Sequence, residues 1–187
     1  MYRIVLVDDE INVLTALRRV ITSIPADELD GERPHIEIFT SATRALDHIE
    51  EQPVDLVISD YRMPEMSGID FLTQVIKQRP DVARLILSGY ADMDGLIRAI
   101  NTVQISRFVS KPWHDFELKS AIAQALATRA LVLDNQRLAG LVRKQEAGLV
   151  RQQAELERLE AENPGITRIR RSEDGGIYLD GLDDDDL

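Results

Sequence analysis

The fold of this 187-residue chain is decided by one stretch, which reads Leu56-Val57-Ile58-Ser59-Asp60-Tyr61-Arg62-Met63-Pro64-Glu65-Met66-Ser67-Gly68. It begins with three apolar residues, reaches a carboxylate at Asp60 and continues through a proline-containing loop to Gly68. A short apolar run bounded by turn residues is typical of a strand buried on both faces. Ligands bind at the carboxyl ends of strands in open parallel sheets. Asp60 is therefore placed to do chemistry.

Apolar segments of similar length alternate with helical patterns along the first two thirds of the chain. We expect strands at residues 2–7, 35–39, 55–59, 83–87 and 105–109. Helical spacing of apolar residues predicts helices at residues 11–23, 42–49, 68–78, 96–100 and beyond 113, with Ser41 as an N-cap. This alternation predicts an α/β fold, a doubly wound five-stranded parallel sheet with helices on both faces. In the strand order 2-1-3-4-5, the first and third strands would be neighbours.

A long helix is predicted after this sheet. Residues 122–162 contain no proline and are rich in Ala, Leu, Glu, Gln and Arg. Heptad spacing places Val142, Leu149 and Leu156 on one position, and Leu138 and Leu159 on the complementary one. We expect this helix either to pair with another helix as a coiled coil or to serve as a solvated spacer.

Three parts of the chain are thus predicted. Residues 1–127 form the α/β domain, and residues 128–162 extend its last helix as a coiled coil. Residues 163–187 form a short tail with a β-hairpin and a disordered acidic end.

Composition excludes several classes of protein. The chain has no cysteine, which excludes a disulfide framework, a zinc–thiolate site and a cysteine nucleophile. A formal net charge of −11 disfavours binding to nucleic acid. No apolar run is long enough for a signal peptide or a membrane span. We expect a cytoplasmic protein with no nucleic-acid partner and no membrane insertion.

Polar groups end four of the five predicted strands, namely Asp8 and Asp9, Asp60, Ser88 and Lys111. Three carboxylates at neighbouring strand ends would repel one another unless a hard divalent cation lay between them, and Mg²⁺ suits such a site. Asp60 could then act as a nucleophile that accepts a phosphoryl group, while the metal and Lys111 neutralise the phosphoryl charge. The Ser88 hydroxyl could donate a hydrogen bond to a phosphoryl oxygen.

Each residue has a simpler interpretation when it is taken alone. The pair Asp8-Asp9 fits a helix N-cap, Ser88 fits a turn, Lys111 fits a solvated surface lysine and Phe108 fits a core position. Their joint placement at strand ends favours a phosphoryl site over these separate interpretations.

Four segments together resemble the receiver domain of bacterial two-component response regulators: Val7-Asp8-Asp9-Glu10, Ser59 to Gly68, Leu87-Ser88-Gly89, and Phe108 to Trp113. The resemblance covers about residues 1–127. It implies a flavodoxin-like receiver fold and transfer of a phosphoryl group to Asp60 from a sensor histidine kinase or a phosphotransfer protein. It implies no other enzyme activity, apart from hydrolysis of the chain's own acyl phosphate.

The same resemblance implies a role for each matched residue. Asp9, Asp60 and the backbone carbonyl of Arg62 would bind Mg²⁺ or Mn²⁺, and Asp8 would bind it through water. Lys111 would pair with the phosphoryl group.

Two further pairs of residues are expected to control the signal and its lifetime. Ser88 and Phe108 resemble the switch residues of receivers, whose side chains rearrange on phosphorylation. Arg62 and Tyr90 lie two residues after Asp60 and Ser88, where bulky side chains are expected to slow hydrolysis by flanking the route of the attacking water.

The output is expected to be protein interaction. The chain shows no helix-turn-helix with a basic segment, so we expect the long helix and tail to bind a protein partner or to form a homodimer through the coiled coil. A non-phosphorylated pseudo-receiver, acting as a structural adaptor or dimerisation module, is the alternative. A phosphatase of the haloacid-dehalogenase type fits poorly, because it needs a second aspartate where this chain has Arg62.

Overall fold

The computed structural model of the chain describes residues 1–29, 31–89 and 105–164. The helices and strands, in chain order, are β1 (Tyr2–Val7), α1 (Ile11–Thr22), the 3₁₀ helix η1 (Ala26–Leu29), β2 (Pro34–Phe39), α2 (Ala42–Glu51), β3 (Leu56–Asp60), α3 (Gly68–Gln78), β4 (Ala83–Gly89), β5 (Arg107–Lys111) and α5 (Asp115–Glu162). The predicted helix at residues 96–100 and the predicted hairpin of the tail lie outside the described residues. The chain divides into two units after residue 135.

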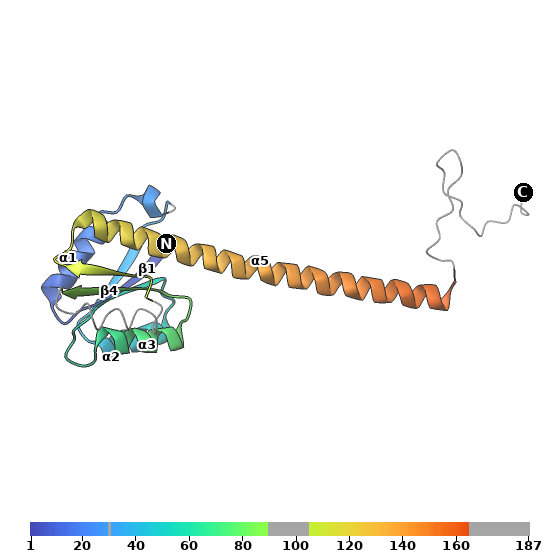
Figure 1. Cartoon of the computed structure of the whole chain (residues 1–187), viewed down its shortest axis with the longest axis horizontal. Helices are drawn as coiled ribbons and strands as arrows, with labels where there is room; N and C mark the ends of the chain where they lie inside the picture. The colour runs from blue at the N-terminus through green and yellow to red at the C-terminus, as the bar shows by residue number, and fades with distance from the viewer. Residues whose placement is uncertain (30, 90–104, 165–187) are drawn as a thin grey trace, which may run out of the picture. The chain divides into compact units, whose positions relative to one another are not determined.

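The five strands form one parallel sheet in the order β2-β1-β3-β4-β5, as predicted. Helices α1 and the first turns of α5 cover one face, and α2 and α3 cover the other (Figure 1). Because β1 pairs with β3 and Val7 lies opposite Ser59, the residues that follow these two strands meet at one edge of the sheet. This edge is where the polar strand ends collect.

Burial on both faces explains why the strands read as continuous apolar runs. Within β1, Ile4 and Leu6 pack into the core under α1 and α5, whereas Val5 and Val7 pack into the core under α2 and α3. The predicted N-cap of α2 is confirmed, since the Ser41 side chain accepts a hydrogen bond from the backbone N–H of Arg44.

Four strands differ from the predictions by one or two residues at their ends. Strand β2 begins at Pro34 rather than at residue 35, and β3 spans Leu56–Asp60 rather than residues 55–59. Strand β4 continues beyond residue 87 because its ladder with β5 runs through the pair Gly89 and Lys111. Strand β5 begins at Arg107 rather than at residue 105, because that ladder starts at the pair Leu85 and Arg107.

Helix α5 continues without interruption from Asp115 to Glu162, as predicted. Its early turns bury Leu118, Ile122 and Leu126 against the sheet. No helix in the described ranges, α5 included, is long and apolar enough to cross a bilayer.

Arg129 fastens α5 to the amino ends of two strands. Its guanidinium contacts Asp55 Oδ1 at 2.8 Å and Asp81 Oδ2 at 2.9 Å, and its Nε donates to the backbone carbonyl of Asp81 at 2.9 Å. Asp55 precedes β3 and Asp81 precedes β4, so one side chain ties the helix to both. The planar guanidinium suits such a multidentate contact.

Gly68 begins α3 directly against the end of β3. A Cβ atom at this position would overlap the backbone carbonyl oxygen of Asp60 and lie 3.1 Å from Ser59 Oγ. The close approach of α3 to the Asp60 backbone therefore requires glycine here.

We expect Gly68→Ala to destabilise the domain by about 1–3 kcal/mol, because backbone atoms must move to admit the methyl group. Gly140→Ala is the matched control, since a Cβ there meets nothing within 4 Å and should add up to about 1 kcal/mol of helix stability. Urea unfolding followed by circular dichroism measures both changes. Equal stability of Gly68→Ala and the parent would contradict the close approach.

Candidate functional site

Three ionisable side chains from three strand ends converge at the carboxyl edge of the sheet. Asp8 follows β1, Asp60 ends β3 and Lys111 ends β5. The Lys111 ammonium lies 2.7 Å from Asp8 Oδ2 and 2.5 Å from Asp60 Oδ1. Asp8 is 1% exposed and Asp60 8%. The ammonium therefore bridges two buried carboxylates, which fits the charge-assisted pairing that such groups require.

Backbone amides fix the second oxygen of each carboxylate. The N–H of Glu10 donates to Asp8 Oδ1 at 2.8 Å, and the N–H of Arg62 donates to Asp60 Oδ2 at 2.9 Å. The N-cap position of α1 is Glu10, so the N-cap interpretation of Asp8-Asp9 is wrong. Both carboxylates are oriented before any ligand arrives.

The pKa values of two of these groups reflect competition between burial and charge pairing. Burial raises the pKa of Asp8, and the hydrogen bonds from Lys111 and Glu10 reduce that rise without cancelling it. Burial alone would lower the pKa of Lys111, but the hydrogen bonds and charges of Asp60 and Asp8 together outweigh it and raise the pKa. Lys111 consequently remains an ammonium ion at neutral pH.

The remaining predicted site residues lie around this cluster in different ways. Ser88 is buried and follows Leu87, the partner of Asp60 in the β3–β4 ladder. Phe108 is 38% exposed, so the core interpretation of this residue is wrong. Asp9 and Arg62 have exposed side chains. Tyr90 lies outside the described residues.

The donor set for a metal consists of two buried carboxylates and their neighbours. Within the described ranges, no group of three or more His, Cys, Asp or Glu side chains is arranged to hold a metal ion. Asp8 and Asp60 both contact the Lys111 ammonium, whereas Asp9, the residue after Asp8, is exposed. The buried oxygens suit a hard cation such as Mg²⁺, which takes few protein ligands and keeps several waters.

A side-chain tether that the sequence did not predict holds the loop after Asp60. Glu65 Oε2 accepts hydrogen bonds from Ser41 Oγ at 3.0 Å and from the N–H and hydroxyl of Thr43, both at 3.1 Å. These bonds lower the pKa of Glu65. The tether joins the β3–α3 loop to the start of α2. Only the Ser41 N-cap signal was readable from the sequence.

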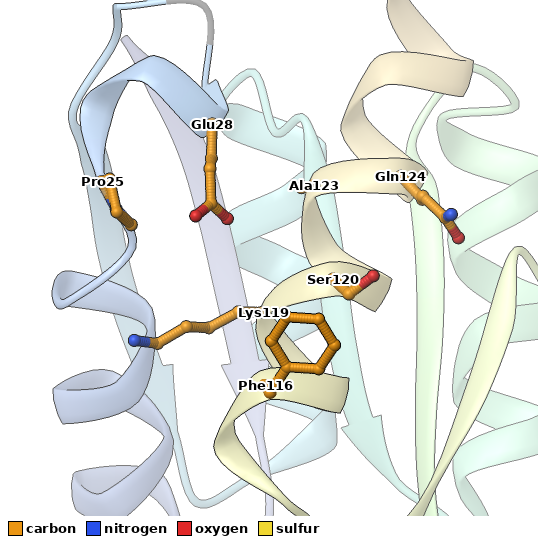
Figure 2. Close-up of a pocket in the computed structure, with 7 residues that line it drawn as sticks. All are labelled: Pro25, Glu28, Phe116, Lys119, Ser120, Ala123 and Gln124. Carbon is orange, nitrogen blue, oxygen red and sulfur yellow. The ribbon is translucent and has the colours of Figure 1, made fainter.

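A separate surface pocket of about 440 Å³ lies beside α5, between that helix and the segment after α1 (Figure 2). Its lining includes Glu28, Phe116 and Lys119, and Phe116 is 84% exposed. No residue of the strand-end cluster lines it. The convergence of charges at the strand ends makes that edge, rather than this pocket, the candidate site.

Comparison with known proteins agrees with this geometry. The family model described as "Response regulator receiver domain" matches residues 4–123. The hydrogenase transcriptional regulatory protein HoxA of Cupriavidus necator is 31% identical over 135 residues, which are 72% of this chain and 26% of that protein. The response regulator protein TmoT of Ectopseudomonas mendocina is 33% identical, over 66% of this chain and 52% of that protein.

A solved structure shows the same similarity in three dimensions. The signal receiver domain of an HD domain-containing protein from Pseudomonas fluorescens Pf-5 has a TM-score of 0.60 and 33% identity, covering 69% of this chain and 97% of that one. The match thus spans about a quarter of HoxA and about half of TmoT, but nearly all of this isolated receiver. This chain belongs to the response regulator receiver domain family of two-component systems.

Proposed function

We propose that this protein is phosphorylated on Asp60 in a Mg²⁺-dependent reaction, with a histidine kinase or a phosphotransfer protein as the donor. The observation that carries this proposal is the double ion pair of Lys111 with Asp8 and Asp60 at the carboxyl edge of the sheet. A carboxylate that is buried, oriented and next to a fixed ammonium is suited to nucleophilic attack on a phosphorus atom.

The chain's own residues supply most of the mechanism. An oxygen of Asp60 forms the new P–O bond as the P–N bond of a phosphohistidine breaks, and the imidazole nitrogen keeps the bonding electrons. The Lys111 ammonium shifts from Asp60 to a phosphoryl oxygen and neutralises part of its charge. The Ser88 hydroxyl donates to another phosphoryl oxygen.

The metal would be held by the carboxylates of Asp9 and Asp60 and the backbone carbonyl of Arg62, with Asp8 contributing through water. Mg²⁺, or Mn²⁺ in its place, supplies positive charge that stabilises the transferring phosphoryl group. The two buried carboxylates and the raised pKa of Asp8 support this assignment, because a buried carboxylate is stabilised by any added cation.

Phosphorylation adds nearly two negative charges at the strand ends. The movement of Ser88 toward them would release space for the exposed ring of Phe108 to turn inward, which changes the face near β5. The signal would then pass into α5, which is continuous from the domain to Glu162.

The proposed output is protein interaction through this helix and the tail, in the cytoplasm, with neither DNA binding nor membrane insertion. The net charge of −11 supports the first exclusion. Residues 1–127 would act as the phosphoacceptor domain, residues 128–162 as the output helix and residues 163–187 as the tail.

Incubation with acetyl phosphate and Mg²⁺, followed by intact-mass analysis, tests the phosphoacceptor. We expect the parent to gain one phosphoryl group and Asp60→Asn to gain none. Lys111→Met should slow the reaction by roughly 100-fold, because a fixed charge at the transferring group is lost. Lys119→Met, a lysine of α5 away from the site, is the control. An unmodified parent protein would instead favour a pseudo-receiver that acts as an adaptor or dimerisation module.

Asp8→Asn tests the electrostatics of the site. Because burial raises the pKa of Asp8 above its ordinary value of 3.8, its ionised form destabilises the folded protein as the pH rises from that value through the raised pKa. In chelator at neutral pH we expect Asp8→Asn to be the more stable protein, because the amide carries no charge to bury. The difference should vanish below pH 3.8, where Asp8 becomes protonated in both the folded and the unfolded states.

Thermal unfolding across this pH range, with chelator and with Mg²⁺, measures the effect. Mg²⁺ should stabilise the parent more than Asp8→Asn, because it binds the folded protein through this site. A variant less stable than the parent in chelator at neutral pH would contradict the assigned cost of burying Asp8.

Arg62 and Tyr90 are proposed to slow hydrolysis of the acyl phosphate by obstructing the attacking water. We expect the double variant Arg62→Ala, Tyr90→Ala to lose its phosphoryl group up to about tenfold faster than the parent. Arg44→Ala, an exposed arginine on α2, is the control. The half-life of the phosphorylated mass after removal of acetyl phosphate measures the rate. An unchanged half-life would remove this role.

A further inference from the structure

The carboxyl-terminal half of α5 carries large apolar side chains that are exposed. Leu138 is 58% exposed, Val142 52%, Leu149 65% and Leu156 54%. In contrast, Leu118, Ile122 and Leu126 in the early turns are buried against the sheet. A helix with an exposed apolar stripe gains stability by burying it against a partner.

The stripe follows a heptad pattern, in which every seventh residue occupies the same position on the helix. Heptad position a is held by Asn135, Val142, Leu149 and Leu156, and position d by Leu138, Gln145, Gln152 and Leu159. We call these eight residues the seam. Its three polar members are all amides, and amides identify the partner because each carries both a hydrogen-bond donor and an acceptor.

A seam amide is satisfied by an identical amide opposite it. In a parallel, in-register pair of this helix, position a faces a and d faces d, so Asn135, Gln145 and Gln152 each meet their own copy. Every apolar seam residue then meets an apolar one.

An antiparallel pair in which residues 135–159 of both chains overlap completely would match the seam residues less well. It would place Gln152 against Val142, Gln145 against Leu149, and Asn135 against Leu159. Each buried amide would then face an aliphatic side chain and lose its hydrogen-bond partner, which is costly.

We infer that residues 135–159 form a parallel, in-register two-stranded coiled coil with a second copy of this chain. The inference rests on the proposed role of this helix as the output. It does not depend on the chemistry of Asp60.

Charges flanking the seam set its salt dependence. Glu155 at position g faces Glu160 at position e of the other chain in a parallel pair, so like charges repel there. Arg158 offsets part of this repulsion through ion pairs on its own helix, 3.0 Å to Glu155 and 3.6 Å to Glu162. Added salt should therefore strengthen the dimer, because it screens the remaining repulsion.

Analytical ultracentrifugation of the full chain tests the seam. We expect a dimer whose dissociation constant rises at least about 100-fold in Leu149→Glu and changes less than about threefold in Val150→Glu. The two residues are neighbours with similar exposure, 65% and 68%, but only Leu149 lies on the seam. A chain that stays monomeric at roughly 100 µM overturns the inference. A chain that pairs only with an added helix carrying basic flanking residues, and not with itself, overturns it as well. So does a dimer that both variants weaken equally.

The absence of cysteine from the chain allows a direct test of register. Gln152→Cys should form a disulfide-linked dimer on mild oxidation, since a parallel, in-register seam places residue 152 opposite its own copy. Val150→Cys, which faces outward, should not. A dimer that fails to cross-link at residue 152 overturns the parallel register.

The same preparations separate this inference from the phosphorylation proposal. A chain that dimerises and cross-links but takes no phosphoryl group from acetyl phosphate retains the coiled coil and refutes Asp60 phosphorylation. A chain that is phosphorylated but monomeric supports phosphorylation of Asp60 and refutes the coiled coil.

Discussion

The structure depends on one ammonium group placed between two buried carboxylates. Asp8 and Asp60 are brought together because β1 and β3 are neighbours, and at such close quarters their charges repel. Lys111, which lies 103 residues after Asp8 in the sequence, contacts both. The strand order therefore places two like charges at one edge of the sheet. Lys111, at the end of β5, offsets their repulsion.

Much of this could be predicted because it follows from periodic patterns and strand ends. Apolar runs located the five strands. Gly68 at the start and Pro80 after the end predicted α3 at its observed bounds. The convergence of Asp8, Asp60 and Lys111 followed from the parallel order. The tether of Glu65, the contacts of Arg129 and the exposure of Phe108 could not be predicted, because they depend on side-chain packing between distant segments that leaves no periodic signal.

The loop after Asp60 is held by several independent contacts. The N–H of Tyr61 donates to the carbonyl of Leu87, the N–H of Gly68 donates to the carbonyl of Tyr61, and Glu65 binds the start of α2. A loop fixed in this way resists backbone movement at its ends. A change of state at Asp60 is therefore expected to travel through the side chains around it, above all Lys111, rather than through rearrangement of the loop itself.

The contacts of Arg129 also bear on how the chain folds during synthesis. The family match ends at residue 123, yet α5 still buries Leu126 and then anchors Arg129 to the two aspartates before β3 and β4. Translation proceeds from the amino terminus, so those aspartates emerge from the ribosome well before their cation. The nascent domain can reach its final stability only once residue 129 has cleared the exit tunnel.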